Sequence, residues 1–192
     1  MSRILAINSA KVFDESKGAL NNTLTEVIRD HLTNLNHEVK ITHVDNGYDI
    51  QEEIDKLLWA DSIIYQMPVW WMGAPWILKK YFDDILNVGQ GKLFKNDGRN
   101  RQDPSKKYGS GGLLHEKTYM LSLTWNAPLE AFEDPNQFFE GKGVDGLFFP
   151  FHKINKFLGM SPLPTFNCYN VVKAPEIESD INQLKIHLSN VF

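Results

Sequence analysis

The chain has 192 residues, enough for one domain that buries a core without disulfide bonds. Its 20 Lys and Arg stand against 24 Asp and Glu, and the net charge of −4 argues against a nucleic-acid binder, which is usually basic. The single cysteine, Cys168, excludes an intrachain disulfide, and no apolar stretch reaches the roughly 18 residues of a membrane span, so we expect a soluble, cytoplasmic protein without membrane insertion.

Short apolar runs alternate with helical repeats in the first half of the chain. A continuous or alternating apolar run predicts a strand, and apolar residues three and four apart predict a helix. In chain order, we predict a strand at 4–8, a loop at 9–18, a helix at 20–35, a strand at 38–44, a helix at 50–58, a strand at 62–67 and a helix at 76–86. Pro68 ends the third strand, and Pro75 suits the first turn of the next helix, where a missing N–H costs nothing.

The second half of the chain is less regular. Residues 89–112 are rich in Gly, Asn, Asp, Lys and Arg, which predicts a long loop or insertion. After it we predict a strand at 117–124, an irregular segment at 128–145, a helix at 145–158 that Pro150 starts or interrupts, a strand at 163–169 and a helix at 180–191. In the irregular segment, we expect Phe132, Phe138 and Phe139 to be exposed or packed on a ligand.

The alternation of five strands with helices predicts an α/β fold. Such an order needs a parallel sheet with helices on both faces, and five strands suit the flavodoxin-like order 2-1-3-4-5. We expect a single domain over residues 1–192, with residues 89–112 as a loop insertion. In this fold, ligands bind beyond the carboxyl ends of the strands, which places a site at the loops after strands one, three and four.

The first of these loops leads into a helix N-terminus. Its candidate residues are Ser16, Lys17, Gly18, Ala19, Leu20, Asn21, Asn22 and Thr23. Free backbone N–H groups at a helix start bind phosphate, and hydroxyl, amide and ammonium side chains add to that. Plain helix capping explains the same residues equally well. Neither a Walker A loop nor a Gly-x-Gly-x-x-Gly fingerprint follows the first strand.

The other two loops carry aromatic residues. Val69, Trp70, Trp71 and Met72 lie between two prolines, and this composition suits a wall for a flat ring or a hydrophobic dimer contact. After the fourth strand come Thr124, Trp125, Asn126 and Ala127, which could hydrogen-bond and stack on a ligand.

Other chemistries lack their motifs. The chain has no Gly-x-Ser-x-Gly elbow and no His-Glu-x-x-His pair, and its six histidines are scattered, so we expect neither a nucleophilic hydrolase nor a metal site. We interpret His152 as structural and Cys168 as an inert buried thiol.

Several long and unusual runs resemble one family. They are residues 20–26, 66–76, 103–112, 121–128 and 150–153, and they include Trp-Trp-Met-Gly-Ala-Pro-Trp and Leu-Thr-Trp-Asn-Ala-Pro. On these runs the chain resembles the bacterial NADPH:quinone reductases called modulator of drug activity B, nearly from end to end. The resemblance implies a flavodoxin-like homodimer that binds FAD, takes hydride from NADPH and reduces a quinone.

The resemblance also assigns parts of the site. Residues 16–23 would hold the FAD pyrophosphate, residues 69–72 would line the isoalloxazine, and Tyr108 with residues 124–127 would complete the pocket. NAD(P)H would give a hydride to flavin N5, leave, and be replaced by a quinone that takes the hydride in turn. Animal quinone reductases carry Thr-Gly-Gly where this chain has residues 125–127, so the catalytic side chain is unassigned.

Three alternatives stay open. The first is a flavodoxin-type electron carrier, although such carriers are usually more acidic, and the second is reduction of nitro or azo groups by the same flavin. The third is a non-enzymatic scaffold that uses Trp70 and Trp71 as an interaction patch. In the enzyme, we expect Trp71→Ala to weaken flavin binding, because it removes aromatic surface from the predicted ring site.

The long loop carries its own charge. Residues 95–107 contain five basic and two acidic residues, a local net of +3 in a chain of net −4. We hypothesise that Arg99 or Arg101 grips the 2′-phosphate of NADPH and so selects it over NADH. A solvated or dimer-clasping loop is an equally good interpretation.

Overall fold

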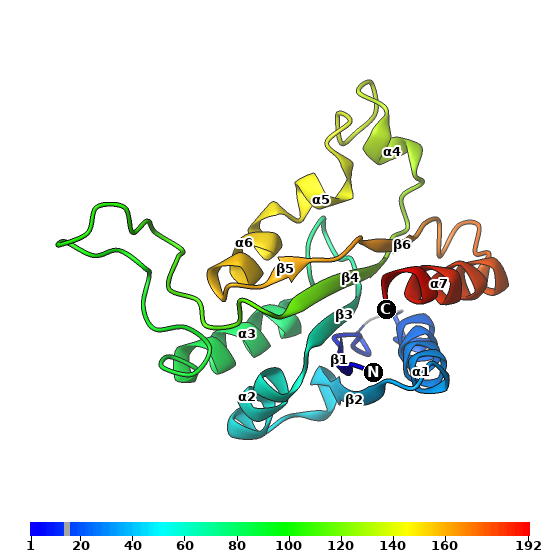
Figure 1. The fold of residues 1–192 in the computed structure, drawn as a ribbon. Helices are drawn as coiled ribbons and strands as arrows, with labels where there is room; N and C mark the ends of the chain where they lie inside the picture. The colour runs from blue at the N-terminus through cyan, green and yellow to red at the C-terminus, as the bar shows by residue number, and fades with distance from the viewer. Residues whose placement is uncertain (14–15) are drawn as a thin grey trace.

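A parallel β-sheet forms the centre of the molecule (Figure 1). A computed structural model of the chain describes residues 1–13 and 16–192. Its strands are β1 (Arg3–Asn8), β2 (Glu38–His43), β3 (Ser62–Pro68), β4 (Thr118–Thr124), β5 (Ser161–Pro162) and β6 (Phe166–Cys168). Their order is β2-β1-β3-β4-β5, and β6 also pairs with β4. The predicted flavodoxin-like fold and strand order are therefore confirmed, with a sixth strand added.

Helices cover both faces of this sheet (Figure 1). They are α1 (Ala19–Asn34), α2 (Ile50–Trp59), α3 (Trp76–Val88), α4 (Glu130–Glu133), α5 (Gly143–Leu147), α6 (Phe149–Phe157) and α7 (Ile177–Val191), with a short 3₁₀ turn η1 (Val44–Asn46). The apolar sides of α1 and α7 pack on one face, and those of α2, α3 and the α4–α6 segment pack on the other. No helix among the described residues has the length and apolar character that crossing a bilayer requires.

Strand β1 shows why the sheet is buried on both sides. Successive side chains of a strand point to opposite faces. Ile4 and Ala6 therefore enter the core under α1 and α7, whereas Leu5 and Ile7 enter the core on the other face. Because both sets are apolar, the strand is a continuous apolar run, which is typical of a parallel sheet covered by helices.

Helix α2 is fixed at both ends by polar side chains. At its start, the Asp49 carboxylate accepts a hydrogen bond from the backbone N–H of Glu52 at 2.9 Å, a typical N-cap. At its end, the Lys117 ammonium donates to the carbonyl of Leu58 at 2.8 Å and also to that of Ala60. A cation there satisfies carbonyls that have no intrahelical partner and opposes the helix dipole. Burial lowers the pKa of Lys117.

The predicted C-terminal strand at 163–169 is wrong in its bounds. Two short strands, β5 and β6, take its place beside β4. Pro162 pairs with Tyr119, and Phe166 pairs with Ser122. Four residues of this edge therefore lie opposite three residues of β4, so the edge contains one extra residue. That is the register of a bulge, and proline, which lacks an N–H, occurs there and at sheet edges. Pro164 lies between the two strands and breaks the run.

The helices near the C-terminus also differ from prediction. The single helix expected at 145–158 is two helices, α5 and α6, which meet at Phe148, and Pro150 lies in the first turn of α6. The last helix begins at Ile177 rather than at residue 180. The segment expected to be irregular contains α4. Phe132 from α4 is fully buried rather than exposed, with its ring centroid 4.6 Å from that of Trp125.

The expected long loop joins α3 to β4 without a named helix or strand. Fully buried Leu93 anchors its start, and the backbone N–H of Lys95 bonds the carbonyl of Gly111 at 2.8 Å. A side chain at Gly112 would collide with the backbone of Leu158. The last part of this loop, before β4, therefore lies directly against the end of α6. That the whole chain forms one domain stays a prediction.

Candidate functional site

A cavity of about 490 Å³ opens beyond the carboxyl ends of the strands. It lies where the chain order in the sheet reverses, because β1 is flanked by β2 on one side and β3 on the other. Its lining includes ten of the predicted site residues, namely Ser16, Lys17, Gly18, Ala19, Leu20, Asn21, Val69, Trp70, Thr124 and Asn126. Pro68, Val171 and Val172 complete the wall. Residues 14 and 15 of the predicted loop lie outside the described residues.

The remaining predicted residues do not line this cavity. Asn22 and Met72 line other cavities, and Thr23 is exposed on α1. Trp125 is buried in the core and donates its indole N–H to the amide oxygen of Asn167 at 3.1 Å. Ala127 packs beside the same core. Trp71 and Tyr108 also lie outside the lining of this cavity.

The N-terminus of α1 opens into the cavity without a side-chain cap. Gly18 precedes the helix with φ of +67°, and no side chain of the described residues caps the first turn. The N–H groups of Ala19, Leu20 and Asn21 have no intrahelical acceptor, as at any helix start. The first turn holds no acidic residue, and Lys17 lies beside it in the cavity wall. Side-chain capping, the competing interpretation of these residues, is not observed, and the phosphate site itself stays a prediction.

Gly18 is needed for this geometry. Its left-handed backbone conformation strains any other residue, and a Cβ there would lie 3.3 Å from the Cβ of Ala10. The close approach brings the loop after β1 against the start of α1. Asn8 reinforces it, because its amide donates to Asn22 at 2.8 Å and its oxygen accepts from the Ala10 N–H at 2.8 Å.

A buried chain of hydrogen bonds ties α1 to β3 and β4 beneath the cavity. Gln66 donates to the Asn21 side-chain oxygen at 2.7 Å and accepts from the Ser122 hydroxyl at 2.7 Å. The Asn21 amide in turn donates to the Thr124 hydroxyl at 3.1 Å. All four side chains are buried. The chain therefore fixes the first turn of α1 relative to the strands that carry the rest of the site.

A tight turn presents the aromatic wall. Trp70 and Gly73 exchange backbone hydrogen bonds at 3.0 and 3.2 Å, and the two residues between them, Trp71 and Met72, have φ of +48° and +64°. This is a type I′ arrangement, which Asn and Gly normally occupy, and a bulky residue there costs about 1–2 kcal/mol. Trp70 lines the cavity and packs 5.5 Å from Phe13, whereas Trp71 is 94% exposed. The turn thus holds one Trp inward and one outward under strain.

The long loop carries Tyr108 away from this cavity. The Tyr108 ring packs 5.7 Å from that of Phe157, and the Arg99 guanidinium lies 5.7 Å from the Tyr108 ring centroid. Arg99 also donates to the Asp97 carboxylate, which raises the pKa of Arg99. The Arg99 guanidinium is already paired with Asp97, so Arg101 is the better candidate to bind the 2′-phosphate of NADPH. That the loop selects NADPH over NADH stays a prediction.

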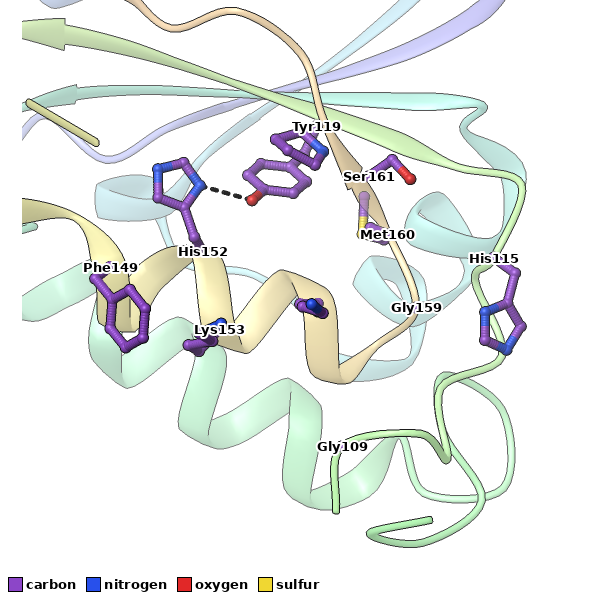
Figure 2. Close-up of a pocket in the computed structure, with 11 residues that line it drawn as sticks. Gly109, His115, Tyr119, Phe149, His152, Lys153, Gly159, Met160 and Ser161 are labelled. Carbon is purple, nitrogen blue, oxygen red and sulfur yellow. Dashed lines mark hydrogen bonds between the residues drawn. The ribbon is translucent and has the colours of Figure 1, made fainter. Parts of the chain in front are cut away.

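A second large cavity, which the sequence did not reveal, lies between α6, β5 and the segment before β4 (Figure 2). Its volume is about 520 Å³. The Tyr119 hydroxyl and His152 Nδ1 are 2.7 Å apart in its wall, and Asp145 lies 3.3 Å from His152 Nε2. Burial is the main cause that raises the pKa of Tyr119 to about 12. His152 is thus hydrogen-bonded to a residue 33 positions away in sequence. This contact is compatible with the structural role predicted for His152.

Metal binding has no matching constellation in the described part of the chain. Within residues 1–13 and 16–192, no group of three or more His, Cys, Asp and Glu side chains is placed to hold an ion. Cys168 is buried, and burial is the main cause that raises the pKa of its thiol to about 12. Its thiol therefore stays protonated and unreactive at neutral pH.

Known proteins share this architecture and, in part, this sequence. A family profile described as a flavodoxin-like fold matches residues 2–191. The NADPH:quinone oxidoreductase MdaB of Haemophilus influenzae is 52% identical over 189 residues, 98% of this chain and 98% of that protein. A Schizosaccharomyces pombe protein described as uncharacterised is 52% identical over 190 residues, 99% of this chain and 97% of that protein.

Solved structures agree on the fold at much lower identity. General stress protein 14 of Treponema denticola, solved in complex with FMN, superposes with a TM-score of 0.70 at 16% identity and covers 99% of both chains. The chain therefore belongs to the flavodoxin-like fold family, and within it to the same group as MdaB.

Proposed function

We propose that this protein is an FAD-dependent NADPH:quinone oxidoreductase that works in the cytoplasm as a homodimer. The observation that carries the proposal is the uncapped N-terminus of α1 beside the strained aromatic turn, both in one cavity at the switch point of the sheet. The relationship to MdaB supports the substrate class. The cytoplasm suits a protein with one unpaired cysteine and a need for NADPH.

The residues of the cavity fit a flavin. The N–H groups of Ala19 to Asn21 and the Lys17 ammonium would hold phosphate oxygens, while Val69 and Trp70 would pack against the ring. Asn126 would hydrogen-bond its polar edge. Ser9, directly after β1, has a buried hydroxyl with no hydrogen-bond partner among the described residues, an orphan that a ligand at this loop would relieve.

When bound, the flavin supplies through N5 the two-electron chemistry by which NADPH reduces a quinone in two successive half-reactions. The protein contributes position and electrostatics. The α1 dipole and Lys17 bind the phosphate end, so that the ring end lies against the Trp70 wall.

A dinucleotide fits the site better than a mononucleotide. A polar cavity of about 260 Å³ adjoins the first one and shares Lys17 and Gly18 with it. Its lining includes Lys11, which is paired with Asp45 at 2.5 Å, and His43. The two cavities flank the N-terminus of α1, and this arrangement supports the proposal that one would hold the flavin ring and the other the adenosine of FAD.

The homodimer would cover apolar surface beside the aromatic turn. A cavity of about 310 Å³ there is lined mainly by apolar residues that include Met72, Phe82 and Phe151, and Trp71 stands exposed next to it. Contiguous apolar surface of this kind usually marks an interface.

Release of the cofactor tests the proposal most directly. We expect the denatured, yellow holoprotein to release FAD, identified by mass, and we expect NADPH to bleach the bound flavin and a quinone to restore its colour. Colourless protein, or flavin that NADPH leaves oxidised, would contradict the proposal, whereas native FMN would contradict the dinucleotide assignment alone.

A matched pair of tryptophan variants tests which ring lies against the flavin. Because Trp70 lines the cavity and Trp71 does not, Trp70→Ala should lower flavin affinity by roughly tenfold to a hundredfold, and Trp71→Ala should change it little within one subunit. This reverses the choice made from sequence. Fluorescence titration of apoprotein with FAD gives both affinities. A larger loss in Trp71→Ala than in Trp70→Ala would place the ring on the outer tryptophan, supplied across a dimer interface.

A further inference from the structure

The second large cavity is separate from the flavin site. It lies at the start of β4, where Tyr119 is the second residue, whereas the flavin cavity lies at Thr124, the last residue of the strand (Figure 2). Five residues of strand span roughly 16 Å. The two cavities share no lining residue. A ligand in one therefore leaves the other available.

The ionisable side chains that line this cavity are basic, apart from the Tyr119 phenol. They are His115, His152, Lys153 and Lys156, and the Asp145 carboxylate lies 3.3 Å from His152 Nε2. Lys153 and Lys156 place two positive charges at the cavity in a chain of net −4. Lys153 and Lys156 lie one helical turn apart on α6, so both side chains project from the same side of this helix, and both line the cavity. Such an arrangement attracts an anion.

The rest of the wall is apolar. Phe149 is 58% exposed and lies under the Lys153 ammonium, which is 4.5 Å from the ring centroid. Met160 and Pro162 also line the cavity. An aromatic ring and a thioether in the wall of one cavity suit a flat apolar body, because both groups stack readily on one.

The polar part of the wall is held in place. Tyr119 and His152 are hydrogen-bonded at 2.7 Å, and His152 Nε2 is buried without a hydrogen-bond partner among the described residues, with an Asp145 oxygen 3.3 Å away. Gly159, with φ of +96°, leaves room for His115, whose ring nitrogen would lie 2.9 Å from a Cβ at that position. Hydrogen-bond donors are thus arranged around the cavity before any ligand enters.

We propose that this cavity binds a small organic anion, a carboxylate on a flat apolar body. The carboxylate would accept hydrogen bonds from Lys153 and Lys156, and the body would lie between Phe149 and Met160. This assignment does not depend on the proposed quinone reduction.

Calorimetric titration of the flavin-loaded protein with naphthalene-2-carboxylate tests the charge requirement. We expect one site per chain and much weaker binding of the neutral naphthalene-2-carboxamide. Lys153→Gln and Lys156→Gln should each weaken carboxylate binding by about fivefold, as expected for a partly exposed ion pair. Lys185→Gln, an exposed lysine on α7 across the sheet, is the matched control and should bind as the parent does.

Methionine methyl signals show where the probe binds. The chain has five methionines; Met160 lines this cavity and Met72 lines the apolar cavity beside the aromatic turn. In protein labelled with ¹³C at the methionine methyl groups, the probe should shift the Met160 signal, identified by Met160→Leu, and leave that of Met72 in place. Absent binding, equal binding of the amide, indifference to both lysine substitutions or a shift of Met72 alone would each overturn the proposal.

Discussion

Gln66→Met should lower the free energy of unfolding by about 3 kcal/mol, because it removes the shortest hydrogen bond of one buried polar group and the acceptor of another. The Asn21 side-chain oxygen loses the donor that lies 2.7 Å away, and the Ser122 hydroxyl loses its acceptor at the same distance. Methionine nearly preserves the volume, so a cavity contributes little to the loss. Urea unfolding monitored by circular dichroism measures the change.

The same substitution should also weaken flavin binding by about tenfold, because the first turn of α1 loses its tether to β3. Gln51→Met is the control, since Gln51 is exposed on α2 and bonds only neighbouring surface groups. A Gln66→Met protein as stable as the parent would mean that the buried chain of hydrogen bonds rearranges at no cost. A stable variant with normal flavin affinity would show that this chain of hydrogen bonds does not contribute to flavin binding.

Glu53→Gln should cost about 3–5 kcal/mol of stability, the range for breaking a buried ion pair. Glu53 on α2 is 1% exposed, and its carboxylate is met by Lys56 at 2.5 Å and by the hydroxyls of Thr42 and Tyr81 at 2.8 Å each. Burial and the Glu53 charge raise the pKa of Tyr81 well above its ordinary value, so the phenol remains a donor. Glutamine keeps the shape, but its amide NH₂ cannot accept the hydrogen bonds that both carboxylate oxygens now accept, and it no longer neutralises Lys56.

The neighbouring Glu52→Gln supplies the control for this prediction. Glu52 is exposed in the same helix turn, and its substitution should change the unfolding free energy by no more than about 0.5 kcal/mol. Thermal or urea unfolding of both variants gives the comparison. Equal stability of the two variants would show that the buried carboxylate contributes no more than its exposed neighbour.

The sequence predicts the fold well because its signals are local. The apolar run at Ile4 to Ile7 and the leucine spacing of α1 depend only on nearby residues, and both elements match the structure within one or two residues. The C-terminal strand is different. Its split depends on how Pro162 and Pro164 meet β4, and that register exists only after the sheet has formed.

The site shows the same limit more sharply. Trp70, Trp71 and Trp125 all lie in proline-containing loops that follow strands, yet one lines the cavity, one is exposed and one is buried against Phe132. The residues next to each Trp do not predict whether it is buried or exposed, because that depends on which distant parts of the chain pack against the loop. The Tyr119–His152 pair was likewise invisible, because its members come from a strand and a helix with unrelated sequence patterns. The loops that form the site were predicted; the direction of each side chain was not.

The uncapped start of α1 has a practical consequence for anyone who handles this protein. A helix end that lacks a side-chain cap accepts inorganic phosphate or sulfate as well as a cofactor. A buffer anion that binds the folded chain there would raise the melting temperature of the apoprotein and, if the proposed FAD site is right, would compete with FAD for the same N–H groups. Apoprotein prepared in phosphate should therefore have a higher melting temperature and a lower apparent affinity for FAD than the same preparation in a bulky organic buffer. Reconstitution experiments should be compared only within one buffer.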